Sequence, residues 1–318
     1  MSKPELAVSA VMRQRFVHAI EMDFQVLLYY KYFRIDDPAA YREEHVALCE
    51  RLGLRGRIIV AEEGINGTVS GELAATQAYM EAMHADPRTA DLWFKVDPAD
   101  GHAFPKLSIK VRDEIVSLNL GEDDLDPNEL SGKRLSPVEF KRAMEEEDVI
   151  VLDGRNDYES ALGRFKGAVC PELRNFRDFP EWIRENLADA KDKKLLTYCT
   201  GGIRCEKLSG FLLKEGFKDV SQLEGGIVTY GRDQEVRGEG FEGKCYVFDQ
   251  RIAVPIDESA PPVSACLRCG EPSDRYVNCA YPPCNDQVFL CETCEGAEGR
   301  FCSDECRTAK AAAAPSIG

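Results

Sequence analysis

The cysteines near the end of the sequence constrain its fold more than any other feature. Eight of the 13 cysteines fall in four pairs, and two to four residues separate the two cysteines of each pair. This spacing lets both thiolates of a pair reach one tetrahedral Zn²⁺ ion. Four pairs are enough for two sites of four cysteines, so we predict that residues 266–306 fold around two structural zinc ions. The predicted ligands are Cys266, Cys269, Cys279, Cys284, Cys291, Cys294, Cys302 and Cys306.

The spacing leaves the pairing of these ligands open. We favour an interleaved arrangement, in which the first pair shares a metal with the third and the second with the fourth, over a sequential one. No pair is incomplete, so no coordination position is left for a substrate, and the metals are expected to be structural. An iron–sulfur centre is the alternative that we favour less. A segment of about 45 residues has too small a core to fold alone, and metal binding supplies the missing stability.

Such a concentration of cysteines indicates metal ligands where thiols stay reduced, and the rest of the sequence points to the cytoplasm. Residues 1–5 lack the apolar core behind a basic cluster that a secretory signal needs. No apolar run approaches the roughly 18 residues of a membrane helix, so we do not expect an integral membrane protein. The formal net charge of −16 argues against indiscriminate binding to nucleic acids or anionic membranes, and it leaves room for a local basic groove.

The first part of the sequence has the pattern of a small α/β domain. We expect residues 1–23 to form a helix or a loose arm. Residues 24–122 follow the order β-α-β-β-α-β, which is the ferredoxin-like arrangement. The predicted strands are 25–33, 57–61, 68–70 and 92–96, with helices at 36–52 and 72–85, an Asn-Gly turn within 64–67, and one or two further strands within 104–118.

The stretch Lys106–Arg112 alternates strictly between apolar and polar residues. Leu107, Ile109 and Val111 fall on one face of a strand, and the opposite face carries Lys106, Ser108, Lys110 and Arg112. The usual interpretation is a half-exposed strand with solvated charges. The alternative is a row of cations that binds phosphates.

Residues 123–254 have the pattern of a doubly wound α/β domain. Short, fully apolar runs at 149–152, 195–198 and 220–223 are typical of buried parallel strands, and helical stretches lie between them. We expect a polar linker at 123–133 in front of this domain and strand-like residues at 245–254 to close it. A second linker at 255–265 leads to the cysteine-rich module, and the alanine-rich tail at 307–318 is expected to be disordered.

The most informative motif for function is a loop that begins at Cys199. A buried strand ends there, Thr200, Gly201, Gly202 and Ile203 follow, and a helix starts near Arg204. Two glycines let backbone N–H groups converge on one point, and the helix N-terminus adds partial positive charge. A cysteine in such a cradle has a depressed pKa. We therefore predict Cys199 as a nucleophilic thiolate and Arg204 as an anion-holding cation, against the plainer interpretation of a buried structural cysteine.

Cys205 lies six residues beyond Cys199, at the start of the helix. Two interpretations are open: a resolving thiol for Cys199, or a small side chain that packs in the core.

The loop resembles the active-site loop of the rhodanese family. It has one residue fewer between Cys and Arg than the loop of cysteine phosphatases, which must surround a tetrahedral phosphate. A smaller loop suits a terminal sulfur on cysteine. Other segments fit the same resemblance: Asp153-Gly154-Arg155 after a strand, Glu159, Gly163 with Gly167-Ala168, and Gly225-Gly226. Asp153 and Arg155 are interpreted as a structural pair.

The whole arrangement resembles the bacterial tRNA uridine hydroxylase family, which joins an acylphosphatase-like N-terminal domain to a rhodanese domain, often with a cysteine-rich tail. The motifs that carry the resemblance are residues 62–68 (EEGINGT), 104–112 (FPKLSIKVR) and 198–207 (YCTGGIRCEK). The resemblance implies an enzyme of the oxidoreductase class that uses O2 to hydroxylate the wobble uridine of tRNA at C5. It implies a persulfide on Cys199, and a sulfur or electron donor that remains unidentified. As a hypothesis, Lys106, Lys110 and Arg112 hold the backbone of the tRNA anticodon region.

Two other functions compete with this one. A rhodanese-type sulfurtransferase would pass sulfane sulfur to an acceptor, and the loop chemistry permits it directly. A non-enzymatic adaptor would use the zinc module and the ferredoxin-like domain for binding, but it has no need of both Cys199 and Arg204.

Overall fold

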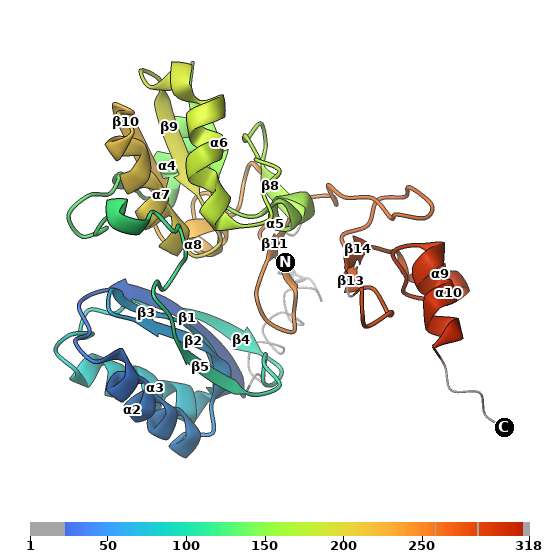
Figure 1. The fold of residues 1–318 in the computed structure, drawn as a ribbon, viewed down its shortest axis with the longest axis horizontal. Helices are drawn as coiled ribbons and strands as arrows, with labels where there is room; N and C mark the ends of the chain where they lie inside the picture. Colours follow the sequence, from blue (N-terminus) through green and yellow to red (C-terminus); the bar gives the residue numbers. More distant parts are fainter. Residues whose placement is uncertain (1–22, 258, 285, 314–318) are drawn as a thin grey trace, which may run out of the picture. The chain divides into compact units, whose positions relative to one another are not determined.

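The computed structural model describes residues 23–257, 259–284 and 286–313 (Figure 1). The expected arm at 1–23 therefore lies outside the described residues, apart from Asp23. The chain divides into two compact units, with the boundary between Val116 and Ser117. In the part of the chain that the structure describes, no helix is long and apolar enough to cross a membrane.

The first unit is a five-stranded sheet with two helices on one face (Figure 1). The strand order is β4-β1-β3-β2-β5, all neighbours are antiparallel except β2 and β5, and the β-α-β-β-α-β order confirms the ferredoxin-like prediction. The elements are β1 (Phe24–Tyr32), α2 (Pro38–Arg51), β2 (Arg55–Ala61), β3 (Gly64–Glu72), α3 (Leu73–Ala85), β4 (Lys95–Ala99) and β5 (Leu107–Val111).

The Asn-Gly turn predicted within 64–67 is wrong. β2 ends at Ala61, Glu62 and Glu63 form the turn, and Gly67 lies inside β3 opposite Tyr29 of β1. A Cβ on Gly67 would lie 2.4 Å from the phenol ring of Tyr29, so glycine serves close packing at this position. Tertiary packing thus overrides the local turn signal.

The predicted strand at 92–96 begins three residues later, at Lys95. Hydrogen bonds from Thr89 N to Asp86 O and from Leu92 N to Thr89 O form a turn after α3 instead. Leu92 is buried in the core from this turn, which explains why its sequence pattern resembles a strand. The stretch 104–118 contributes one strand, β5.

The second unit is built on a parallel sheet with strand order β6-β10-β9-β7, which confirms the α/β prediction. Helix α4 begins at Pro137 and is preceded by the N-cap residue Ser136, whose side chain forms a capping box with Glu139. The strands are β6 (Lys133–Leu135), β7 (Ile150–Asp153), β9 (Lys194–Tyr198) and β10 (Asp219–Leu223), and the helices are α4 (Pro137–Met144), α5 (Asp157–Leu162), α6 (Phe179–Asn186), α7 (Ile203–Lys214) and α8 (Gly226–Arg232).

The segment expected as a linker at 123–133 packs on this unit. Lys214 Nζ donates to Asp123 O at 2.6 Å, and the backbone N–H of Gly132 donates to Ser209 Oγ at 2.8 Å. This segment therefore belongs to the second compact unit, which starts at Ser117. Strand-like residues after 240 also behave differently from the expectation: β11 (Phe241–Tyr246) pairs with β8 (Gly163–Phe165) and β12 (Ala253–Pro255) in a separate antiparallel sheet.

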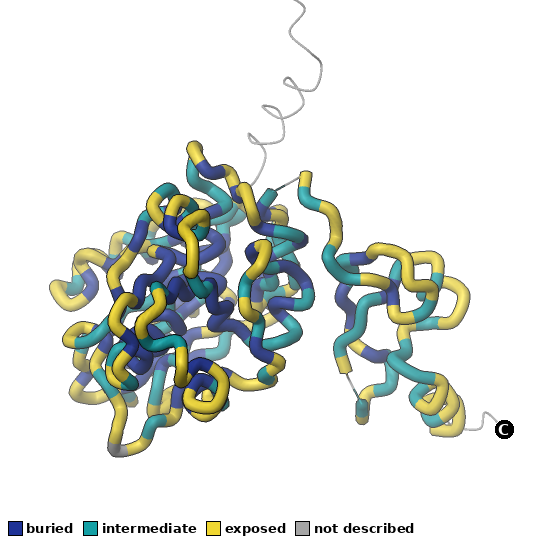
Figure 2. The backbone as a smooth tube through the Cα atoms, turned by 90° about the horizontal axis from the view of Figure 1, so that it is seen from above, coloured by how far each residue is buried: buried dark blue, intermediate teal, exposed yellow. Residues whose placement is uncertain are grey.

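The cysteine-rich module consists of a hairpin, β13 (Tyr276–Asn278) with β14 (Gln287–Phe289), followed by α9 (Glu292–Glu298) and α10 (Asp304–Ala312). Its apolar core is small and centres on Cys266, Val277 and Leu290. Figure 2 shows that most of its chain is exposed or partly exposed. The prediction of a disordered tail from 307 is wrong as far as Ala312, because Ser303 caps α10 and alanine is the best helix former.

Candidate active site and metal centres

Cys199 lies directly after β9, at the carboxyl end of the parallel sheet, and is 0% exposed. Gly202 takes a left-handed conformation with φ of 100° and starts α7. This bend aims its backbone N–H at Cys199 Sγ, 3.1 Å away. The backbone N–H groups of Gly202, Arg204 and Cys205 thus lie against this sulfur, and Thr200, Gly201 and Ile203 form the rest of the loop.

The environment of Cys199 favours the thiolate. Burial raises the pKa of its thiol, but a hydrogen bond from the Cys205 thiol, the positive charge of Arg204 and the backbone N–H groups of both residues lower it further. The net result is a pKa lowered to about 5. Burial and donation to the Cys199 thiolate raise the pKa of Cys205 well above its ordinary value. One thiol of the pair is thus ionised at neutral pH and the other is protonated.

Glu159 of α5 contacts the Cys199 loop, and the sequence analysis gave it no role. Its carboxylate accepts two hydrogen bonds from Arg204, at 2.6 and 2.8 Å, and one from the backbone N–H of Asn156, at 3.1 Å. Burial raises the pKa of Glu159, yet the charge and hydrogen bonds of Arg204 outweigh it and lower the pKa. Arg204 is therefore oriented by a carboxylate from α5. The only sequence signal for this was the position of Glu159 in the rhodanese-like pattern.

The loop that contains Gly225 and Gly226 packs against the Cys199 loop and forms hydrogen bonds with it. The backbone N–H groups of Ile227 and Val228 donate to the carbonyls of Cys199 and Thr200, at 3.0 and 3.1 Å. A Cβ on Gly226 would lie 2.6 Å from Cys199 O, and its φ of +71° also requires glycine. This contact explains Gly226, and a φ of 71° explains Gly225, the other member of the pair that the sequence analysis noted only as a resemblance.

Phe248 is the exposed aromatic side chain beside this loop. The guanidinium carbon of Arg204 lies 5.9 Å from its ring centroid, and its ring packs edge-on against Tyr246, 5.0 Å away. Phe248 is 44% exposed, whereas Cys199 is fully buried. Nothing in the sequence around Phe248 distinguishes it from other aromatic residues, so sequence reasoning missed it.

Asp153 and Arg155 form a fully buried ion pair. Tyr198, the last residue of β9, donates its hydroxyl to Asp153 at 2.8 Å, and Arg155 also donates to Gly163 O at 2.6 Å. The pair thus ties β7, β8 and β9 together beneath the loop, consistent with the structural role expected for it.

The eight cysteines of the module form two groups of four. One contains Cys266, Cys269, Cys291 and Cys294, and the other contains Cys279, Cys284, Cys302 and Cys306. This is the interleaved grouping that the sequence analysis favoured. The first pair and the third meet because the β13–β14 hairpin brings residues before and after it together.

The sulfur positions fit a tetrahedral metal. In each group the Sγ atoms all lie within 4.8 Å of one another, and Cys269 and Cys291 are 3.8 Å apart. Cys302 lies 3.5 Å from both Cys284 and Cys306. Four sulfurs around Zn²⁺ at about 2.3 Å are separated by about 3.8 Å. Both groups can therefore hold a zinc-like ion, which would stabilise a module with a very small core.

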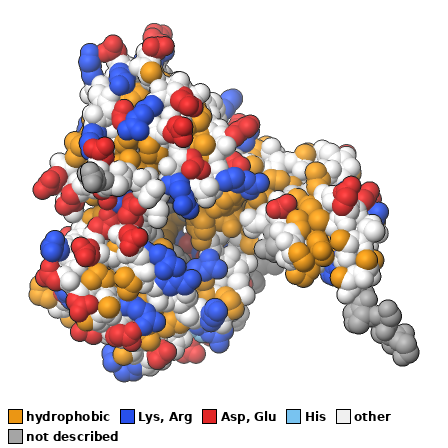
Figure 3. All heavy atoms as spheres, viewed as in Figure 1, with side chains coloured by type: hydrophobic (Ala, Val, Ile, Leu, Met, Phe, Trp, Pro, Cys, Tyr) orange, Lys and Arg blue, Asp and Glu red, His pale blue; other side chains and the backbone are white. Residues whose placement is uncertain are grey.

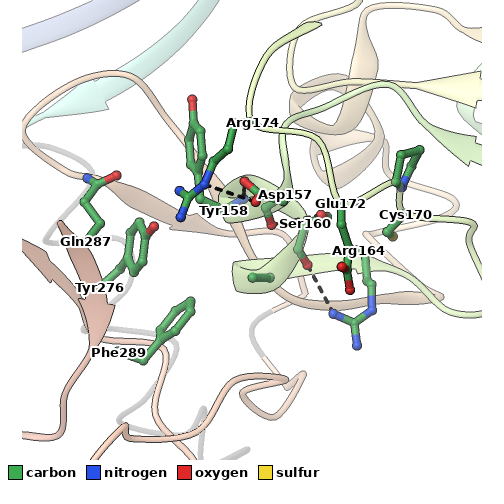
Figure 4. Close-up of a pocket in the computed structure, with 12 residues that line it drawn as sticks. Asp157, Tyr158, Ser160, Arg164, Cys170, Glu172, Arg174, Tyr276, Gln287 and Phe289 are labelled. Carbon is green, nitrogen blue, oxygen red and sulfur yellow. Dashed lines mark hydrogen bonds and ion pairs between the residues drawn. The ribbon is translucent and has the colours of Figure 1, made fainter. Parts of the chain in front are cut away.

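The cavity in Figure 4 lies elsewhere in the second unit and has a volume of about 410 Å³. Its walls come from α5, from β8 and the residues after it on one side, and from the β13–β14 hairpin on the other. Tyr158, Arg164, Arg174, Tyr276 and Phe289 are among its lining residues. Since no residue of the Cys199 loop lines it, we do not assign the reaction to it.

Lys106, Lys110 and Arg112, the predicted RNA-binding residues, lie on or beside β5 in the first unit, and all three are exposed. Ile109 points to the core, as the alternation predicts, whereas Val111 is 37% exposed.

Comparison with known proteins agrees with this domain order. Residues 24–115 match the UPF0176 acylphosphatase-like domain, residues 136–233 the rhodanese-like domain, and residues 242–307 the rhodanase C-terminal domain. Among solved structures, the chain is similar to a rhodanese-like domain protein from Staphylococcus aureus, with 28% identity, a TM-score of 0.26, and coverage of 31% of this chain and 91% of that chain.

Curated relatives match nearly the whole length. The tRNA uridine(34) hydroxylase of Bacillus licheniformis is 57% identical over 89% of this chain and 88% of its own. The protein of the same name from Shouchella clausii is 54% identical over 90% of this chain and 89% of its own. The chain belongs to the tRNA uridine(34) hydroxylase family.

Proposed function

We propose that this protein hydroxylates C5 of uridine 34, the wobble uridine of tRNA, and that Cys199 carries the reaction. The observation that supports this most directly is the buried Cys199 thiol, whose pKa is lowered inside a loop of backbone N–H groups, in a chain of this family. One oxygen atom of O2 is inserted into the C5–H bond, which gives the hydroxyl group, and the other leaves as water. This balance requires two electrons and two protons, which a donor must supply.

Cys199 forms a persulfide in this proposal. Its thiolate attacks the sulfane sulfur of a donor, the donor leaves as a thiolate, and Cys199 keeps the terminal sulfur. Gly202 N–H, 3.1 Å from Sγ, and the N–H groups of Arg204 and Cys205 are placed to stabilise negative charge on sulfur. Thr200, Gly201 and Ile203 shape the loop that surrounds it.

Arg204 and Cys205 position this sulfur. Arg204 is fixed by Glu159 and supplies positive charge, and Cys205 donates a hydrogen bond to the thiolate. A resolving role, in which Cys205 attacks the Cys199 persulfide and releases hydrogen sulfide as the disulfide forms, is the alternative for Cys205.

The substrate and the ions complete the proposal. Lys106, Lys110 and Arg112 contact phosphates of the anticodon region, where an unpaired base is accessible without opening a duplex. Two zinc ions fill the cysteine groups and have a structural role. A tRNA substrate and a free thiolate support a cytoplasmic location.

The test is mass spectrometry of tRNA nucleosides from cells that lack the gene, complemented with wild type, Cys199→Ser or Cys49→Ser. Cys49 is a buried thiol of the first unit and serves as the matched control. We expect 5-hydroxyuridine to be restored by wild type and Cys49→Ser and to stay absent with Cys199→Ser. If a thiolated nucleoside falls instead and 5-hydroxyuridine is unchanged, the protein is a sulfurtransferase, a function that the same loop permits.

A further inference from the structure

The sheet of the first unit has helices on one face only (Figure 1). Helices α2 and α3 cover the face that carries Leu27, Ile58 and Ile109, whose side chains are buried in the core. Residues of opposite orientation in the same strands form the other face. Around Val26 and Ser70 this face is covered by Ala103 and Phe104, and we call the uncovered remainder the open face. Tyr30 of β1, Thr68 of β3, Arg55 and Arg57 of β2, and Ser108 and Lys110 of β5 belong to it.

Three cations lie together at one side of the open face. Arg57 of β2 is opposite Ser108 of β5, and Lys110 of β5 is opposite Ile59 of β2. Arg55, Arg57 and Lys110 therefore lie on two adjacent parallel strands. All three side chains are exposed. Figure 3 shows Lys and Arg side chains on the surface of this unit, with Asp and Glu side chains between them.

These cations have no ion-pair partner among the residues that the structure describes. Other cations of the same unit are paired: Lys31 with Asp91, Arg34 with Asp36, and Arg88 with Asp86. Like charges on adjacent strands repel one another locally, even in a chain with a formal net charge of −16. A bound anion would relieve this repulsion.

The opposite edge of the face carries an exposed aromatic side chain. Trp93 is 50% exposed and precedes β4. Lys95, which is only 3% exposed, places its ammonium 4.6 Å from the Trp93 ring centroid and 5.1 Å from that of Tyr30. These contacts hold the indole beside the open face. Five strands at about 4.8 Å spacing put β4 and β5 about 19 Å apart.

We propose that the open face binds a single-stranded segment of RNA, with phosphates on Arg55, Arg57 and Lys110 and an unpaired base stacked on Trp93. Exposed aromatic rings beside cations suit unstacked bases, whereas the bases of a duplex are stacked on one another and out of reach. The identification of this RNA as the loop of the tRNA anticodon arm rests on the proposed function.

The experiment measures binding of full-length protein to a 17-nucleotide anticodon stem-loop, chosen as about the smallest complete arm, and to a blunt duplex of equal length, across a salt series. The test variant is Arg55→Ala/Arg57→Ala/Lys110→Ala. The matched control is Arg34→Ala/Arg142→Ala/Lys218→Ala, which removes the same charge at exposed, ion-paired positions. Thermal unfolding confirms that each variant is folded.

We expect the test variant to bind the stem-loop at least tenfold more weakly. The slope of log binding constant against log salt concentration should become less steep by about 2, because each phosphate contact with a single strand contributes about 0.7 to it. Trp93→Ala should weaken binding at least fivefold and leave the slope unchanged. Equal loss in both triple variants, or stronger binding to the duplex than to the stem-loop, would overturn the proposal.

The results distinguish failure of the proposed RNA site from failure of the proposed function. If the test variant loses RNA binding while wild type produces no 5-hydroxyuridine, the open face binds RNA and the proposed function is wrong. If the test variant keeps RNA binding and hydroxylation, the hydroxylation of uridine stands, the open face is not the RNA site, and the phosphate contact proposed for Lys110 is wrong.

Discussion

The guanidinium of Arg204 and the carboxylate of Glu159 form a buried, bidentate ion pair, with N–O distances of 2.6 and 2.8 Å. The pair brings together a residue of the Cys199 loop and a residue of α5 that precedes it by 45 positions. It fixes the cation next to the thiolate, so that the loop is preorganised before any substrate binds.

Removal of the carboxylate charge should destabilise the protein. Glu159→Gln keeps the shape of the side chain but leaves the buried Arg204 cation without its counter-charge, which typically costs 3–5 kcal/mol. We expect a loss of about 3 kcal/mol in the free energy of unfolding, measured by urea titration. In Glu159→Gln/Arg204→Gln the loss should be smaller than the sum of the two single losses. If the losses in unfolding free energy were additive, the interaction between Glu159 and Arg204 would contribute nothing to stability.

The ionisation of Cys199 should be visible in its pH dependence. With a pKa of about 5, the thiolate persists at neutral pH and is lost only as the pH falls through 5. The difference in absorbance at 240 nm between wild type and Cys199→Ser should therefore show a midpoint near 5. Because the folded-state pKa is depressed from about 8.5, the stability that the thiolate contributes is complete above pH 8.5 and is lost progressively down to 5. A midpoint near 8.5 contradicts this assignment.

The same titration tests Cys205. Cys205→Ala removes the S–H donor and should raise the Cys199 midpoint, whereas Cys205→Ser keeps a donor and should change it less. If Cys205 only positions the sulfur, Cys205→Ser retains hydroxylation. Loss of turnover in Cys205→Ser, with the Cys199 midpoint unchanged, would assign it as the resolving thiol.

Phe248 should affect turnover more than binding. Its partly exposed ring lies 5.9 Å from the guanidinium carbon of Arg204, so a base that reaches the Cys199 loop from this side would meet it. We expect Phe248→Ala to lower kcat at least tenfold with little change in KM for tRNA, and Phe248→Tyr to retain most activity. Leu267→Ala, a change at another exposed apolar residue, is the control. An unchanged kcat in Phe248→Ala would remove this residue from the site.

Metal analysis should find two zinc ions per chain. Chelation should make residues after about 265 sensitive to protease, because the apolar core around Cys266, Val277 and Leu290 is too small to persist alone. The parallel sheet of the second unit should remain resistant, since its core lies in separate residues. Mass spectrometry of the fragments checks both expectations, and cleavage spread evenly over the chain would contradict them.

Contiguous motifs made the Cys199 loop predictable from sequence. Cys199, Gly202 and Arg204 lie within six residues, so local geometry alone brings them together. Glu159 and Phe248 contact the same loop only because of the tertiary fold, and no local sequence pattern indicates either contact. Cysteine spacing likewise indicated the ligands of each pair, while the grouping of pairs depends on the β13–β14 hairpin.

Errors in the predicted fold have a common cause. Gly67 has the sequence signal of a turn, but its missing side chain accommodates Tyr29 of a neighbouring strand. The alanines before Ala312 resemble a low-complexity tail, but a capped start at Ser303 turns them into a helix. In both cases one contact or cap outside the local pattern decides the conformation.

The interleaving of the two cysteine groups has a consequence for how the metals enter. The chain between Cys269 and Cys291 contains Cys279 and Cys284, which belong to the other group. The first ion to bind closes this loop and shortens the remaining span that the second ion must close, which lowers the entropy cost of the second event. Loading should therefore be cooperative, with the apo and doubly loaded forms dominating and the singly loaded form scarce.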